Sequence, residues 1–199
     1  MKMITREQAL LFLNEKISNK NIVKHMLATE ALMRALAHEF IIYNLKFKID
    51  ERIDEDEWAM VGLLHDGDYC EGIPEERQGV QVSQWLKEKG LGISEKMEHA
   101  MAAHNSATGI KPETLLDWAI FCGDSLTGLI VAATLVLPSR KLKDLTVENI
   151  LNRFKEKSFA KGTRREEIAL CEEKLGISLP EFMSLGLKAM QEIAPELGL

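Results

Sequence analysis

The stretch Leu63-Leu64-His65-Asp66-Gly67-Asp68-Tyr69 places an imidazole and a carboxylate side by side at the end of an apolar run. The glycine that follows them predicts the end of a helix. Neighbouring side chains on a regular helix point about 100° apart, so both cannot face the same core position. At the last turn, however, both can lean toward one point in front of the helix. The stretch therefore predicts a helix that ends at two potential metal ligands.

Segments with a helical period surround this stretch along the chain, and most begin at a capping residue. Thr5 with Gln8, and Thr163 with Glu166, match the capping-box pattern. Residues 44–49 alternate only weakly, and we expect loops at 41–53 and 67–72. The predicted helices cover about residues 5–17, 19–40, 54–66, 74–90, 94–105, 112–137, 146–157, 163–176 and 178–194.

Length and composition fit one globular domain. The chain has 199 residues, of which 46% are hydrophobic and 28% charged, and this length is ample for a sizeable core. We expect a single all-α domain over residues 1–199, with a helical core at about 20–137 and a helical C-terminal extension at about 138–199.

The charge and the cysteines narrow the class of protein. A net charge of -6 argues against a general binder of polymeric nucleic acid, which needs a basic face. Cys70, Cys122 and Cys171 are odd in number and far apart, which is typical of reduced thiols in a cytoplasmic protein. The charged N-terminal stretch lacks the apolar core of a signal peptide.

Residues 119–137 are apolar over a length that could cross a bilayer. Asp124 lies in the first third of this segment and glycines interrupt it, so we expect a buried central helix and no membrane contact. An unpaired carboxylate buried there would cost several kcal/mol. Asp124 must therefore bind a metal or a hydrogen-bond donor, or form an ion pair in the core with a lysine or arginine.

His25 lies among apolar residues of the second predicted helix, and taken alone it fits a core histidine better than a ligand. Together, His25, His65-Asp66 and Asp124 occur in the order and spacing of the HD superfamily of metal-dependent phosphohydrolases. The chain resembles this family, and most closely its HDIG-like members, from about residue 22 to 130. The resemblance implies an all-α fold and four metal ligands: His25, His65, Asp66 and Asp124.

The chemistry of these four residues agrees with that assignment. Two imidazoles and two carboxylates carry a charge near -2, which a divalent ion neutralises. A mixed nitrogen and oxygen set suits Mn, Fe, Co, Ni or Zn better than Ca. Such an ion lowers the pKa of bound water from 15.7 to about 7 and polarises a phosphoryl oxygen.

The sequence departs from the family's two-metal pattern. Where such members place a further histidine, this chain has Gln78-Gly79, and a neutral amide is a poor ligand for a transition metal. His104 falls where another extra histidine is expected. We therefore expect one metal per chain with His104 facing the substrate, and two metals as the alternative.

The sequence contains further candidate site residues. Asp68 could position water or act as a base, although a loop-stabilising turn explains it equally well. The basic stretch from Arg153 to Arg165 includes Lys155, Lys157 and Arg164. It is either a solvated surface or a patch that grips phosphate near the mouth of the site.

These observations predict a phosphohydrolase that acts on a small phosphorylated molecule, such as a nucleotide, through a metal-activated water. Two alternatives remain: a metal-containing HD module that senses a ligand without turnover, and a helical scaffold whose buried His and Asp side chains only pair with each other. Metal content separates the scaffold from the other two, and turnover separates the enzyme from the module. The sequence predicts no particular oligomeric state.

Overall fold

The structure is a computed structural model that describes residues 3–47 and 52–199. The all-α class is confirmed: these ranges contain ten α-helices joined by short 3-10 and π turns, and one isolated bridge between Met3 and Gly92 is their only β-structure. The helices are α1 (Arg6–Lys16), α2 (Lys20–Phe47), α3 (Glu55–Leu64), α4 (Gln81–Glu88), α5 (Glu95–Ala103), α6 (Leu115–Leu135), α7 (Val147–Lys155), α8 (Arg165–Ala169), α9 (Leu179–Glu192) and α10 (Ala194–Leu197).

Several helices begin where side-chain caps predict them to begin. The Thr5 hydroxyl accepts a hydrogen bond from the backbone N–H of Gln8, whose side chain accepts one from Thr5 in return. Ser94 caps α5 and Thr146 caps α7 in the same way, through backbone N–H groups in the first turn. Such caps stabilise a helix start because the first N–H groups have no partner within the helix.

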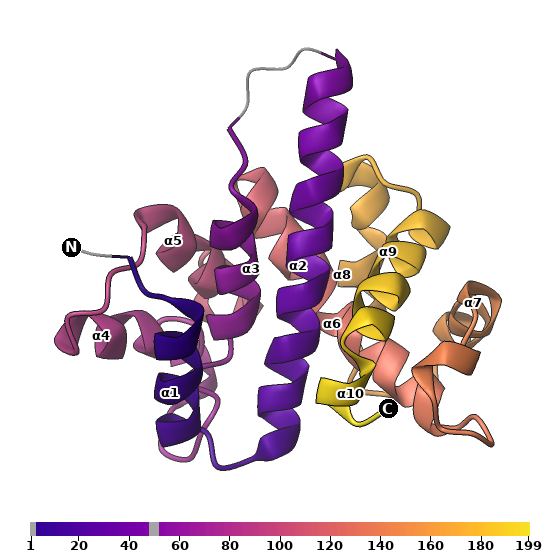
Figure 1. The fold of residues 1–199 in the computed structure, drawn as a ribbon, viewed down its shortest axis with the longest axis horizontal. Helices are drawn as coiled ribbons and strands as arrows, with labels where there is room; N and C mark the ends of the chain where they lie inside the picture. The colour runs from indigo at the N-terminus through magenta and orange to yellow at the C-terminus, as the bar shows by residue number, and fades with distance from the viewer. Residues whose placement is uncertain (1–2, 48–51) are drawn as a thin grey trace.

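Helix α2 is the central axis of the molecule (Figure 1). Helices α1, α3, α4 and α5 lie on one side of it in this view, and α7, α9 and α10 lie on the other. Helix α2 packs against α3, α6 and α9, while α7 and α8 pack against α6. The helices that follow residue 138 therefore cover the two helices that carry His25 and Asp124.

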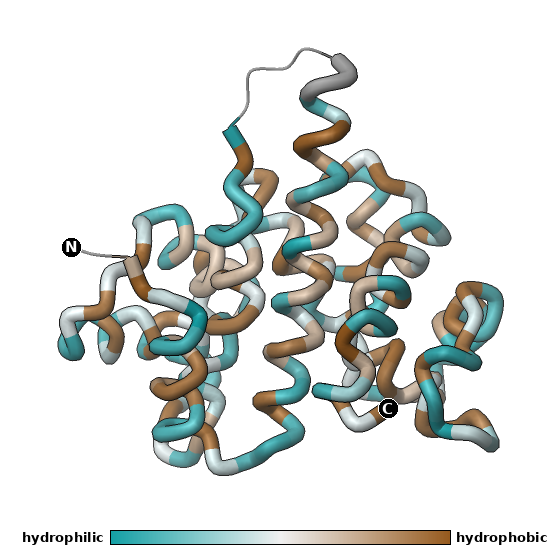
Figure 2. Tube along the Cα trace, viewed as in Figure 1, coloured by the Kyte–Doolittle hydropathy of each residue, from teal (hydrophilic) through white to brown (hydrophobic). Residues whose placement is uncertain are grey.

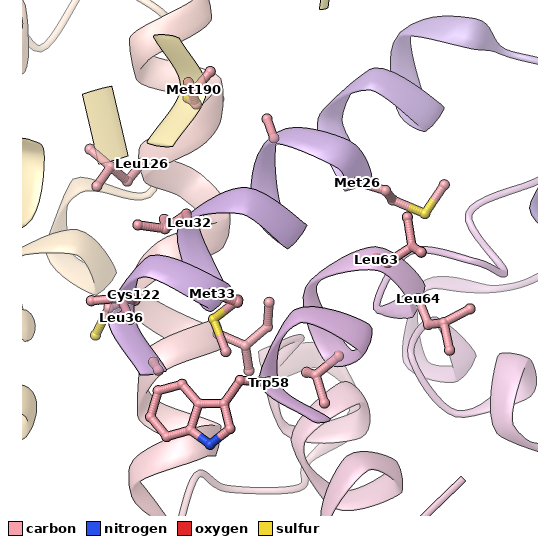
Figure 3. Close-up of a cluster of buried hydrophobic side chains, with 14 of the residues drawn as sticks. Met26, Leu32, Met33, Leu36, Trp58, Leu63, Leu64, Cys122, Leu126 and Met190 are labelled. Carbon is pink, nitrogen blue, oxygen red and sulfur yellow. The ribbon is translucent and has the colours of Figure 1, made fainter. Parts of the chain in front are cut away.

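The core is continuous across these contacts. Figure 3 shows Leu32 and Met33 of α2 among side chains from α3 and α6, with Met190 of α9 at the edge of the cluster. Hydrophobic and hydrophilic residues alternate along α2 and α9 in Figure 2, as amphipathic helices require. Burial of one face of each helix holds the layers together.

Helix α6 is the most apolar helix of the part of the chain that the structure describes. By length and composition it could cross a membrane, but 61% of its most apolar stretch is buried inside the protein. This burial fits the buried central helix that the sequence predicts. The helix begins at Leu115, after the cap Thr114, and not at Pro112 as predicted.

The predicted loop at 41–53 is wrong in its first part, because α2 continues to Phe47; residues 48–51 lie outside the described ranges. The sequence of this part contains no glycine or proline that would end a helix. Phe40 packs its ring 5.8 Å from the ring of Trp58, so α2 is held against α3 up to the residue at which the predicted helix ends. The helix continues beyond Phe40 because no local signal ends it, although Ile42 and Tyr43 are exposed.

Two other predicted helix starts are corrected. The helix expected from Pro74 is a 3-10 turn at Glu75–Arg77, and α4 begins only at Gln81, because Gly79 adopts a left-handed φ of 88° between them. The capping box expected at Thr163 does not form: Arg164 precedes α8, and its side chain makes no cap.

Candidate metal centre

Four helices bring the predicted metal ligands and His104 together. His25 lies in α2, His65 follows the last residue of α3, Asp124 lies in α6, and His104 follows the last residue of α5. Gly62 permits the close approach of α2 and α3, because a β-carbon at this position would lie 2.6 Å from the carbonyl oxygen of Thr29. The ends of α3 and α5 therefore lie near the first turns of α2 and the middle of α6.

The reactive atoms of the predicted ligands lie close together. His25 Nε2 lies 2.9 Å from Asp124 Oδ1 and 3.3 Å from His65 Nε2. Asp66 Oδ2 lies 3.6 Å from both imidazole Nε2 atoms, and Asp124 Oδ1 lies 3.6 Å from that of His65. Two ligands bound at about 2.1 Å to one ion lie about 3.0–3.4 Å apart, depending on the angle between them. The cluster therefore has the size that a single metal ion requires.

A hydroxyl orients the imidazole of His25. The Thr127 hydroxyl lies 2.9 Å from the carbonyl oxygen of Asp124 and 3.1 Å from His25 Nδ1, so it accepts from His25 Nδ1 when its one proton goes to the carbonyl. In this arrangement a neutral His25 carries its proton on Nδ1 and directs an Nε2 lone pair at the cluster, whereas a protonated His25 also donates from Nε2 to Asp124 Oδ1. Thr29 supports the arrangement by donating to the carbonyl oxygen of His25.

The other two histidines are oriented by backbone carbonyls. His65 Nδ1 donates to the carbonyl oxygen of Gly62 at 2.8 Å, and His104 Nδ1 donates to that of Met101. Their Nε2 atoms also point inward, and His104 Nε2 lies 3.5 Å from Asp66 Oδ1. Metal-binding histidines typically hold their second ring nitrogen in this way. The three lone pairs face carboxylate oxygens, an arrangement that only a cation or added protons can stabilise.

The pKa shifts of the cluster also indicate that positive charge stabilises it. Burial lowers the pKa of His25, but the hydrogen bond and the charge of Asp124 outweigh burial and leave that pKa raised. Burial raises the pKa of Asp66, but His65 and His104 reverse the effect and hold it at about 2. The pKa of Asp124 is held well below its usual range, because the hydrogen bonds of His25 and His65 outweigh burial. A divalent ion bound to the carboxylates of Asp66 and Asp124 would supply the positive charge that these pKa shifts favour.

Arg164 reaches the cluster from the start of α8. Its Nη2 donates to Asp124 Oδ2 at 2.7 Å, and its Nε donates to Glu167. The ion pair that the sequence analysis weighed for Asp124 is therefore present, but it uses Oδ2, whereas Oδ1 faces the imidazoles. One carboxylate can thus serve an arginine and a metal at once.

A cavity of about 340 Å³ adjoins the cluster. His25, Asp124 and Arg164 form one part of its wall, and Lys161 lies in the segment 160–164 that closes it. Lys155 and Lys157, expected at the substrate, are exposed side chains that do not line this cavity. Of the basic stretch, Arg164 and Lys161 are the residues at the site.

Asp68 makes its hydrogen bonds within the protein. Its carboxylate is fully buried and accepts hydrogen bonds from the backbone N–H groups of Gly79 and Val82, at 2.8–2.9 Å. Burial raises the pKa of Asp68, although these N–H groups counteract it. The bonds join the loop after α3 to the start of α4, which favours the loop-stabilising explanation over the catalytic one.

The remaining polar residues have partners elsewhere. The Gln78 amide donates to the carbonyl oxygen of Ile73 at 3.4 Å. His99 Nδ1 pairs with Asp117, and His38 Nδ1 pairs with Glu55 at the surface. Thr127 and Thr29 were not predicted as site residues, although their spacing of three and four residues from Asp124 and His25 places each pair on one helix face.

Glu167 was missed as well, because its link to the cluster through Arg164 spans more than forty residues of sequence.

Comparison with protein-family models, curated proteins and solved structures found no match to this chain.

Proposed function

We propose that this protein is a metal-dependent phosphohydrolase that acts on a small phosphorylated substrate, as the resemblance to the HD superfamily implies. One observation carries the proposal. Three imidazoles hold their Nδ1 atoms within hydrogen-bond distance of oxygen atoms and direct their Nε2 atoms at two partly buried carboxylates. A scaffold that only paired its buried His and Asp side chains would not need to fix all three rings in one orientation.

His25, His65, Asp66 and Asp124 would hold one divalent transition metal ion, such as Mn, Fe, Co, Ni or Zn. The ion would supply a bound water with a pKa near 7 and an electrophile for a phosphoryl oxygen. The protein's own contribution is orientation: Thr127 and Gly62 set the two imidazoles, and Arg164 sets Asp124.

His104 lies at the same cluster, where its ligand atom and those of His65 and Asp124 are within 4.8 Å of one another. Its Nε2 lies 3.5 Å from Asp66 Oδ1, whereas Asp66 Oδ2 faces His25 and His65. We assign to His104 the transfer of a proton to or from the substrate at Nε2, because its Nδ1 is held by Met101. The amide of Gln78 is turned to Ile73, so a second metal at Asp66 Oδ1 would lack a further ligand from this residue.

Elemental analysis of the purified protein, followed by phosphoester assays with added Mn, Co, Ni and Mg, tests the proposal. We expect about one metal per chain and turnover that a chelator abolishes and added metal restores. Metal without turnover would favour the ligand-sensing module, and absence of metal would favour the scaffold.

His25→Ala and His38→Ala form a matched pair for this experiment, because both replace a histidine of α2. His38 pairs with Glu55 at the surface, with 60% of its side chain exposed. We expect His25→Ala to lose metal and turnover together, and His38→Ala to keep both. Equal behaviour of the two variants contradicts the assignment of the metal site.

A further inference from the structure

The cavity beside the cluster has a wall that comes from the C-terminal part of the chain. Residues 160–164 face His25 and Asp124 across a space of about 340 Å³. This volume lies at the small end of the range for ligand sites, which suits a phosphate with a small organic group. The wall carries two cationic side chains, Lys161 and Arg164, of which Arg164 is paired with the carboxylates of Asp124 and Glu167.

Arg164 is held in place before any ligand binds. Its bonds to Asp124 and Glu167 use two of the five guanidinium N–H groups, so the others can serve a ligand. Glu167 is itself buried, with 7% of its surface exposed. Because Glu167 already holds Arg164 beside the cavity, ligand binding orders this side chain at a smaller entropic cost than it would order a mobile surface arginine.

Lys161 differs from Arg164 in that it is exposed, but it lines the same cavity. The chain turns into this position at Ala160, which has a left-handed φ of 44°. Residues other than glycine adopt this conformation at a cost, and such positions concentrate at functional sites. The five residues 160–164 thus combine backbone strain with a lysine and a fixed arginine, next to the cluster of His and Asp side chains.

We propose that segment 160–164 is the phosphate-binding wall of the site and that it selects phosphomonoesters, an inference that rests on the proposed function. A phosphomonoester has three non-bridging oxygens, and the site offers three positively charged partners for them: the metal ion, Arg164 and Lys161. A phosphodiester has only two such oxygens, so one of these three would be left without an oxygen. Loss of a charge-assisted hydrogen bond weakens binding by about tenfold.

Inorganic phosphate is the probe, and its affinity for the metal-loaded protein is measured by calorimetry. Lys161→Ala should weaken phosphate binding about tenfold. Lys157→Ala is the matched control, because it removes an exposed lysine four residues away that does not line the cavity. It should leave phosphate affinity unchanged.

The second measurement compares p-nitrophenyl phosphate with bis(p-nitrophenyl) phosphate. Lys161→Ala should raise KM for the monoester about tenfold and leave KM for the diester nearly unchanged. If phosphate affinity is the same in both lysine variants, or if the diester is the better substrate of the unmodified protein, the inference is overturned even when turnover depends on metal. If turnover is absent but the difference in phosphate affinity remains, the proposed function fails while the anion-binding wall stands.

Discussion

Gly62→Ala tests the helix contact on which the candidate metal centre depends. A β-carbon at residue 62 would lie 2.6 Å from the carbonyl oxygen of Thr29 and 2.8 Å from the backbone nitrogen of Glu30. Both atoms belong to the backbone of α2, so no side chain can rotate out of the way. To restore an ordinary contact of 3.4 Å, α2 and α3 must separate by about 0.8 Å.

The size of the effect follows from two opposing terms. Overpacking of this kind costs about 3 kcal/mol, at the upper end of its usual range, because backbone meets backbone. Alanine stabilises a helix interior by about 1 kcal/mol relative to glycine. The free energy of unfolding should therefore fall by about 2 kcal/mol, and Tm should fall by about 4–8 °C for a chain of this length.

Thermal and urea unfolding of Gly62→Ala and Gly128→Ala give the comparison. Gly128 lies in α6, and a β-carbon there would meet no atom within 4 Å, so Gly128→Ala should raise stability by about 0.5–1 kcal/mol. Separation of α2 and α3 also moves His25 from His65, and metal affinity of Gly62→Ala should fall about tenfold. A Gly62→Ala protein as stable as Gly128→Ala would refute the packing argument.

Three further predictions concern single side chains. His104→Ala should keep about one metal per chain while kcat falls by about 10²–10⁴, as loss of a proton-transfer group does; metal analysis and phosphatase kinetics measure both, and loss of a metal equivalent would instead indicate a two-metal site. Asp68→Ala should lower the free energy of unfolding by about 2–4 kcal/mol, because the N–H groups of Gly79 and Val82 lose their acceptor; urea unfolding that matches the unmodified protein would contradict this role. Burial raises the pKa of both Cys122 and Cys171 to about 12, so a thiol reagent at pH 8 should label at most one cysteine, Cys70, in the native protein and all three in urea; labelling of all three without urea would show that the core is open.

The sequence by itself determined the helices with strong local signals. Thr5, Ser94 and Thr146 each place a hydroxyl where the first N–H groups of a helix need an acceptor, and these interactions span only three residues. The all-α class follows from such signals together with the helical period of the apolar residues. The choice of His25, His65, Asp66 and Asp124 as a group also came from sequence, through residue type, order and resemblance.

Only the tertiary structure decided which partners these residues meet. Asp124 could pair with a metal or with a cation by sequence alone, and the fold gives one oxygen to Arg164 and turns the other to the imidazoles. Lys161 and Lys157 are alike in sequence, but the turn at Ala160 brings only Lys161 to the cavity. Asp68 stands two residues after a ligand, yet its carboxylate faces Gly79.

The physical reason is the range of the forces involved. Capping and helical periodicity act between residues three or four apart, so a sequence displays them directly. The contact of Arg164 with Asp124 joins residues forty apart, and that of Gly62 with Thr29 joins two helices. Such contacts depend on how the apolar faces of α2, α3, α6 and α8 pack, and packing is a property of all these helices together.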